Sequence, residues 1–404
     1  MLSQLRKRKV CSPNVIEEID SVTKRFLVGL ESRLQQEDSC IEINKEVNVE
    51  NVQSPLKNSA DIDISDLTMR YSTDLIFSCL YKQQNLVNYK TDEDPFTGVV
   101  EESIFGVRHP IIELSMSLPL FRPIVKWLIL NFHKFGQMKA KVIGFIKEQT
   151  AFNLLARQEM AKAMRAGIDL NPDSFTLSDG RVFKPNMMDG FTDSYHEGKV
   201  TAREYLHTSY FFTLAGVATL ADVLGQMLQY LAIHGEVQER LRDSVLRDGI
   251  ESEYLSWCVN ETLRLTSPAS IGSTREAGRD IEVEGGIVPK GTVVFTPAHM
   301  IHRLPEYWGD DADQFKPERW QHADKFHPAQ FIPFGGGIRG CPGKELALLV
   351  IRKIALSMLA RYKLERCPRT SDSPLFETPL YLFRILETPN YVRIRTLPTQ
   401  CACN

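Results

Sequence analysis

The stretch 331–343 constrains this chain most, because it joins three consecutive glycines to one cysteine and then to a helical pattern. Glycines 335–337 let the backbone adopt positive φ and approach a flat ligand closely. Periodic apolar residues over 344–361 predict a helix, and Pro342 suits the start of one. Cys341 would then lie at the positive end of that helix, which predicts a lowered thiol pKa and a thiolate.

A lone cysteine is most often an ordinary buried side chain. Neither a second cysteine nor a histidine lies near Cys341 in the sequence, so a closed zinc site, which needs four ligands, is not indicated. One thiolate on a glycine-rich loop suits an axial position of a haem iron. The sequence therefore makes Cys341 the candidate metal ligand.

A family resemblance rests on the same stretch. Phe334, Gly337, Arg339, Cys341 and Gly343 occupy every fixed position of Phe-x-x-Gly-x-Arg-x-Cys-x-Gly, and the stretch resembles the haem-binding signature of cytochrome P-450 enzymes. The resemblance implies haem b (iron protoporphyrin IX) with Cys341 as its axial ligand. It also implies that Phe334 packs on the sulfur side, and that Gly335 and Gly343 allow close approach to the cofactor.

Further motifs appear in the order that this family shows. Glu261 and Arg264 match its Glu-x-x-Arg motif, and Arg319, within Pro-Glu-Arg-Trp, matches the third member of its Glu–Arg–Arg triad. A carboxylate shared by two guanidiniums locks a fold, because removing one partner strands a buried charge. Arg275 and Arg339 match positions that usually contact haem propionates. His299 and His302 are expected to be surface or hydrogen-bonding histidines rather than metal ligands.

A long helix is predicted over 201–241, with a glycine in its middle. Either tight helix packing or a cofactor explains such a glycine. Ala215, Gly216 and Thr219 resemble the family pattern Ala/Gly-Gly-x-Asp/Glu-Thr-Thr, which implies cofactor contact at the first two and a catalytic role for Thr219. Ala218 replaces the usual acid and Leu220 the second threonine. A carboxylate with a hydroxyl can relay protons. Asp222, one turn on, is a weak substitute and is expected to be a solvated or capping residue.

Composition limits the partners and the compartment. The formal net charge of −3 and the pI of about 6.3 indicate no nucleic-acid partner. Eight scattered cysteines fit free thiols in a reducing compartment. Residues 110–132 are apolar but are interrupted by charges and prolines, so they are either a segment that dips into a membrane surface or an ordinary core helix.

The expected fold is mainly α with a small β portion, of cytochrome P-450 type and N-terminally truncated. It is expected to form one partial domain over 1–404, with the best-matched core at 201–364. Helices are predicted at 12–36, 66–81 and 142–163, loops at 37–62, 82–95 and 167–198, and a hairpin at 281–291. The family's membrane anchor, first β-region and the helix with its Trp-x-x-x-Arg motif have no counterpart in the sequence.

The resemblance implies a monooxygenase that inserts one atom of O2 into a hydrophobic lipid, steroid or xenobiotic, with electrons from an NADPH-dependent flavoprotein reductase. Its expected place is the cytoplasmic face of the endoplasmic reticulum membrane. Candidate pocket residues are Phe211, Phe212, Val217 and those after Pro268. The alternatives are a haem-thiolate isomerase or dehydratase acting on a lipid peroxide, a truncated inactive chain, and a zinc- or disulfide-stabilised binding protein, which the ligand spacing disfavours.

Overall fold

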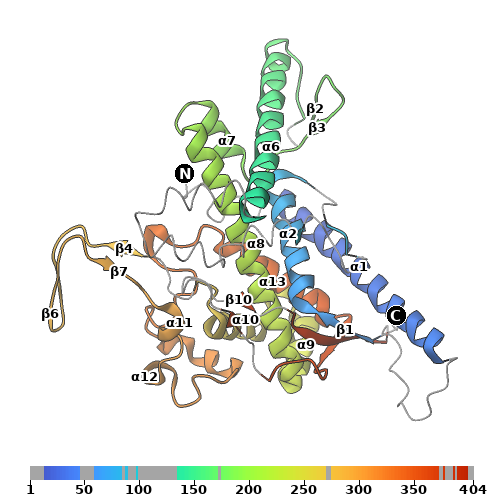
Figure 1. Ribbon diagram of the computed structural model, residues 1–404, viewed down its shortest axis with the longest axis vertical. Helices are drawn as coiled ribbons and strands as arrows, with labels where there is room; N and C mark the ends of the chain where they lie inside the picture. The colour runs from blue at the N-terminus through green and yellow to red at the C-terminus, as the bar shows by residue number, and fades with distance from the viewer. Residues whose placement is uncertain are drawn as a thin grey trace. The chain divides into compact units, whose positions relative to one another are not determined.

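The computed structural model is mainly helical with short strands, which confirms the expected fold class (Figure 1). It describes residues 13–45, 59–83, 87–89, 97–98, 134–171, 174–269, 274–372, 376–377, 385–386 and 389–398. The chain divides into two compact units, Met1–Arg33 with Met69–Ala218, and Leu34–Thr68 with Thr219–Asn404. Residues 110–132, predicted to be either a membrane-surface segment or a core helix, lie outside the described part.

The α-helices are α1 (Pro13–Lys45), α2 (Ile64–Tyr81), α6 (Lys134–Arg165), α7 (Asp189–His196), α8 (Ala202–Ile233), α9 (Gly235–Asp248), α10 (Glu253–Thr266), α11 (Ala298–Ile301), α12 (Pro305–Trp308) and α13 (Lys344–Leu359). Short 3-10 segments are η4 (Gly249–Glu251), η5 (Pro317–Lys325) and η6 (Gly337–Arg339). The strands are β1 (Ser59–Asp63), β2 (Phe175–Thr176), β3 (Val182–Phe183), β4 (Arg275–Glu276), β5 (Ile281–Val283), β6 (Gly286–Val288), β7 (Val293–Val294), β8 (Tyr362–Glu365), β9 (Phe376–Glu377), β10 (Ile385–Leu386) and β11 (Tyr391–Thr396).

In the first unit, the part of α2 from Met69 onward is buried and packs on α1. The rings of Phe26 and Tyr71 meet edge to face with centroids 5.1 Å apart, and the Tyr71 hydroxyl lies 3.1 Å from Thr23 Oγ1. Arg25 Nη2 pairs with the fully buried Asp74 carboxylate at 3.0 Å. Aromatic packing and a paired charge therefore fix one helix against the other.

In the second unit, α10 is the central helix and packs against α9, α11, α13 and η5. Ser252 caps its start, where Oγ accepts the Leu255 N–H at 3.0 Å. Ser267 ends it in a left-handed conformation with φ +33°. Most side chains of α10 are buried, including the charged Glu261 and Arg264. These two charges are the residues from which the candidate site is built.

An antiparallel sheet in the second unit has the strand order β1–β11–β8. Its register pairs Asp63 with Tyr391 and Thr396 with Tyr362. Buried residues alternate along β1 and β11, so one face of the sheet packs on the core. The smaller hairpin β5–β6 pairs Ile281 with Val288, within the predicted hairpin at 281–291.

Several predicted boundaries were wrong. The helix expected over 201–241 is two helices, because the chain leaves helical geometry at His234 (φ −105°, ψ 74°) and α9 begins at Gly235. The loop expected at 37–62 contains the end of α1 and most of β1. The loop expected at 167–198 contains the β2–β3 hairpin and α7. Short strands with distant partners leave little local signal.

Candidate functional site

The loop over 331–343 folds around its glycines. Gly335 and Gly337 have φ of +66° and +65°, in the left-handed region that favours glycine. The Cys341 N–H donates to the Phe334 carbonyl at 2.8 Å, and the Gly340 N–H donates to the Gly337 carbonyl at 3.1 Å. The loop thus closes on itself by backbone hydrogen bonds and presents the cysteine at the start of α13.

Cys341 lies just before α13, whose N-cap is Gly343. Backbone N–H groups of Gly343 and Lys344 donate to its sulfur and lower the thiol pKa, but desolvation is the larger effect and raises the pKa above its usual value. The residue nevertheless keeps an exposed surface. The prediction that the helix end lowers the pKa of the Cys341 thiol is therefore wrong. A coordinated cation would supply the missing stabilisation, because a metal deprotonates a thiol that binds it.

The surroundings of Cys341 fit a haem. A Cβ added at Gly335, Gly336 or Gly337 would meet nothing within 4 Å, so this side of the loop is open to a flat group. Arg339 is exposed on η6 and Arg275 is exposed on β4, where its Nη1 donates to the Thr274 carbonyl at 2.8 Å. Neither guanidinium forms an ion pair within the described residues, so both are available to carboxylates such as propionates.

The predicted Glu–Arg–Arg triad forms around one fully buried carboxylate. Glu261 Oε2 accepts from Arg264 Nε at 2.9 Å and from Trp320 Nε1 at 3.0 Å. Glu261 Oε1 accepts from Arg264 Nη2 at 2.9 Å, from Arg319 Nε at 2.8 Å and from the Lys316 N–H at 2.9 Å. Both oxygens are thus fully used by donors, which supports the structural role predicted for Glu261.

The two guanidiniums use their remaining N–H groups on backbone carbonyls and one further acid. Arg264 is fully buried, and its other donors reach the carbonyls of His302, Ala312 and Gln314 at 2.7, 2.6 and 3.2 Å. Arg319 also donates to the carbonyls of Trp308 and Asp311, and to Asp311 Oδ1 at 3.2 Å. The triad therefore ties α10 to the irregular segment over 302–319.

Sequence reasoning missed the aromatic part of this network. Trp320 donates to Glu261 and packs on Phe331, with centroids 4.5 Å apart. The Arg264 guanidinium carbon lies 5.0 Å from the centroid of the Trp308 ring, and the ring centroids of Trp308 and Trp320 are 5.7 Å apart. The tryptophan in Pro-Glu-Arg-Trp was the available signal. Because Phe331 begins the cysteine loop, these rings connect the triad to that loop.

The candidate residues on α8 divide between the two units. Ala215 and Gly216 belong to the first unit and Thr219 to the second, and all three are partly buried. A Cβ at Gly216 would lie 3.0 Å from Ile76 Cδ1 of α2, so close helix packing explains this glycine. Cofactor contact at Ala215 and Gly216 and catalysis at Thr219 stay predictions.

Asp222 is neither solvated nor a helix cap, contrary to expectation. It is 3% exposed, and its Oδ1 accepts from Gln226 Nε2 at 2.7 Å within α8. The candidate pocket residues differ in exposure: Val217 is fully buried and Phe211 is 62% exposed. Residues 270–273, which follow Pro268, lie outside the described part.

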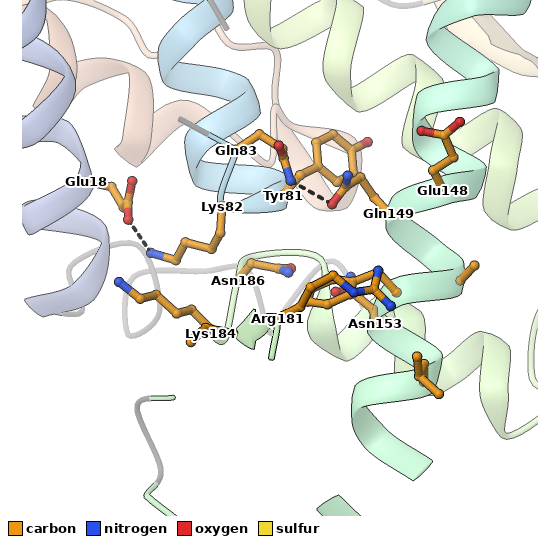
Figure 2. Close-up of a pocket in the computed structure, with 14 residues that line it drawn as sticks. Glu18, Tyr81, Lys82, Gln83, Glu148, Gln149, Asn153, Arg181, Lys184 and Asn186 are labelled. Atoms are coloured by element: carbon orange, nitrogen blue, oxygen red, sulfur yellow. Dashed lines mark hydrogen bonds and ion pairs between the residues drawn. The ribbon is translucent and has the colours of Figure 1, made fainter. Parts of the chain in front are cut away.

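A cavity of about 780 Å³ lies within the first unit (Figure 2). Most of its lining residues are charged or polar: Lys82 Nζ pairs with Glu18 Oε1 at 2.9 Å, and Gln83 Nε2 donates to Gln149 Oε1 at 3.1 Å. Such a polar lining does not suit a hydrophobic substrate. We therefore do not assign this cavity to the candidate site.

Membrane and metal features are limited in the described residues. The helix α8 is long and apolar enough to cross a membrane, but 67% of its most apolar window is buried inside the protein, as in a core helix. The cysteines Cys79, Cys258, Cys341 and Cys367 are free thiols. The described residues contain no cluster of three or more His, Cys, Asp or Glu able to hold a metal ion.

Comparison with known proteins adds independent evidence. The family model for cytochrome P450 matches residues 21–393. Cytochrome P450 3A29 of Sus scrofa is 26% identical over 336 residues, which cover 80% of this chain and 63% of that protein. Cytochrome P450 3A5 of Homo sapiens is 26% identical with the same coverage. Thromboxane-A synthase of Mus musculus is 27% identical, covering 74% of this chain and 61% of that protein.

The chain thus spans less than two thirds of the length of these curated relatives. The family match nevertheless covers most of the chain, including the triad and the cysteine loop. Membership of this family implies a haem-thiolate cofactor with a cysteine ligand. Together with the geometry of α10, the Glu261 network and the Cys341 loop, the match shows that the chain belongs to the cytochrome P450 family.

Proposed function

We propose that this chain is a haem-thiolate monooxygenase, with Cys341 as the iron ligand, that inserts one oxygen atom of O2 into a hydrophobic small molecule. The observation that carries the proposal is the presentation of Cys341 by a self-bonded glycine loop, exposed and next to the amides of Gly343 and Lys344. A haem bound there supplies oxygen activation, favoured by the electron donation of its thiolate ligand.

The chain's own residues hold and orient this group. The amides of Gly343 and Lys344 donate to the sulfur and limit its basicity. The exposed guanidiniums of Arg275 and Arg339 would bind the propionates, and the open glycine face would admit the flat ring. Thr219, on α8, is the hydroxyl assigned to proton delivery.

The remaining partners follow from the family. Electrons come from an NADPH-dependent flavoprotein reductase, and the substrate is a hydrophobic lipid, steroid or xenobiotic. The similarity to cytochrome P450 3A proteins supports a place at the cytoplasmic face of the endoplasmic reticulum membrane.

A second function is favoured by one observation, the absence of an acid at position 218. Ala218 cannot relay a proton, and Asp222 is buried in a hydrogen bond to Gln226. A haem-thiolate isomerase or dehydratase that rearranges a lipid peroxide needs no such relay. One matched relative is itself named a synthase. Turnover of a lipid peroxide without NADPH would identify this alternative.

The test is the absorbance of the reduced protein under carbon monoxide. The wild-type chain is expected to show the strongly red-shifted Soret band of thiolate-ligated haem, and Cys341→Ala to lose it. Cys258→Ala is the matched control, because Cys258 is buried on α10 and is expected to leave the band unchanged. A wild-type chain without bound haem would overturn the proposal and favour the hypothesis that this chain is an inactive member of the family.

A further inference from the structure

We propose that His302 is a positioning residue for the iron ligand, because its imidazole binds the cysteine loop on one side and the end of α10 on the other. The inference rests on the proposed function, since its purpose is to hold Cys341 in place. His302 follows α11 and is 0% exposed. It contacts no reacting group and would act through the loop backbone.

Both ring nitrogens of His302 are used. Nε2 accepts the backbone N–H of Ile332 at 2.9 Å. An accepting Nε2 is unprotonated, so the proton is assigned to Nδ1, which then donates to Ser267 Oγ at 2.7 Å. The Ser267 hydroxyl can accept this proton because its own hydrogen is donated to the Leu263 carbonyl, with Oγ and O 3.2 Å apart. A single tautomer satisfies every partner.

The backbone of His302 is held by the triad. Its carbonyl accepts from Arg264 Nη1 at 2.7 Å, and Arg264 is bound in turn to Glu261. The ring also lies 5.3 Å from Phe331, the residue before Ile332. One residue therefore joins the buried ion network to the entry of the cysteine loop by hydrogen bonds at both ends.

From Ile332 the connection to the ligand is short. The Ile332 carbonyl accepts the Gly335 N–H at 3.0 Å, which forms a turn around Phe334. The Phe334 carbonyl accepts the Cys341 N–H at 2.8 Å. Fixing Ile332 therefore fixes the carbonyl to which the cysteine backbone is bound. Without His302, the Ile332 N–H loses its partner and the turn can rotate.

The backbone conformation of Ser267 indicates that its contact with His302 is maintained by the surrounding structure. Ser267 is one of two described non-glycine residues with positive φ, together with Lys82. A serine in this region has a strained backbone, so its surroundings must hold it. That conformation ends α10 and brings the hydroxyl within reach of His302.

The environment keeps the imidazole neutral, as the hydrogen bonds require. Burial, and then the positive charge of Arg264, lower the pKa of His302 to about 4. A neutral ring can accept from Ile332, whereas an imidazolium cannot.

Two near-isosteric variants separate the two sides of the ring. The amide of His302→Gln reaches the position of Nε2 and can accept from Ile332, whereas that of His302→Asn reaches the position of Nδ1 and can bond only to Ser267. His322→Gln is the control, because His322 is exposed on η5. The readouts are the ratio of neutral-ligand to thiolate bands in the reduced carbon monoxide spectrum and the hydrogen exchange of the Ile332 amide.

We expect His302→Asn to raise the neutral-ligand to thiolate ratio about tenfold and to speed Ile332 exchange by a similar factor, since one buried donor loses its partner. His302→Gln and His322→Gln should stay near wild type. If His302→Asn does not fold, Ser267→Ala takes its place. It removes the acceptor that keeps the ring proton on Nδ1 and Nε2 unprotonated, so both readouts are expected to change in the same direction.

Equal effects of the Asn and Gln variants would show that His302 serves packing only, and would overturn the inference while leaving the proposed function intact. An unchanged ratio in His302→Asn would do the same. A wild-type protein without thiolate-ligated haem would overturn the proposed function and this inference together. The two failures are therefore distinguishable by the wild-type spectrum.

Discussion

Replacing Glu261 by glutamine tests the buried network most directly. The carboxylate is fully buried and accepts five hydrogen bonds, from Arg264 twice, and from Arg319, Lys316 and Trp320. Glu261→Gln keeps the shape but removes the charge and one acceptor oxygen. Whichever way the amide is turned, its NH2 group faces at least two N–H donors, which thereby lose their acceptor.

The magnitude follows from the charges left behind. Breaking a buried ion pair by removing one partner costs about 3–5 kcal/mol, because the other charge stays buried. We therefore expect Glu261→Gln to lower the free energy of unfolding by about 4 kcal/mol. With total stabilities of about 5–15 kcal/mol, that is a large share of the whole.

Urea unfolding of the haem-loaded protein is the assay. At an m value of about 3 kcal/mol/M, a loss of this size lowers the midpoint by more than about 1 M. Glu318→Gln is the matched control, because Glu318 accepts from Arg240 Nη1 at 2.8 Å on a side chain that is 38% exposed. Its expected loss is about 0–1 kcal/mol. A Glu261→Gln midpoint equal to that of the control would refute the reasoning.

Two further predictions concern pH and helix packing. The pKa of His302 is about 4 in the folded protein, against an ordinary value of 6.5. The neutral ring therefore stabilises the fold fully above pH 6.5, and about 3 kcal/mol of that stability is lost as the pH falls towards 4. His302→Gln should flatten this dependence when the free energy of unfolding is measured from pH 7 to 4. Gly216→Ala should lower the melting temperature slightly, because its Cβ would lie 3.0 Å from Cδ1 and 3.3 Å from Cγ1 of Ile76, whereas Gly216→Val should cost about 1–3 kcal/mol. Equal melting temperatures for the two Gly216 variants would contradict the packing explanation.

Local signals predicted much of the second unit. The start of α13 at Lys344 and the pairing of Glu261 with Arg264 follow from residue spacing along one helix. By contrast, β1 lies partly in a predicted loop because its partner β11 is more than 300 residues away. The break at His234 also escaped prediction, because apolar periodicity continues across it into α9.

The pKa of the Cys341 thiol shows where a local rule fails. The helix terminus is present, and two amides do donate to the sulfur, as the sequence predicted. Desolvation by the surrounding protein outweighs them, and desolvation depends on tertiary structure, which no local motif reports. The same reason explains why the sequence left open whether His302 is a surface or a hydrogen-bonding histidine. Its partners Ser267 and Ile332 are 35 and 30 residues away in the chain.

The α8 residues bear on which reaction the site performs. Asp222 binds Gln226 through one carboxylate oxygen, since Gln226 Nε2 lies 2.7 Å from Oδ1. Asp222 is also 3% exposed, so bulk water does not reach its carboxylate directly. A proton relay through Asp222 would therefore have to draw its protons from inside the protein. Thr219 is thus the hydroxyl on which the monooxygenase proposal depends, while a rearrangement without proton delivery places no such demand on α8.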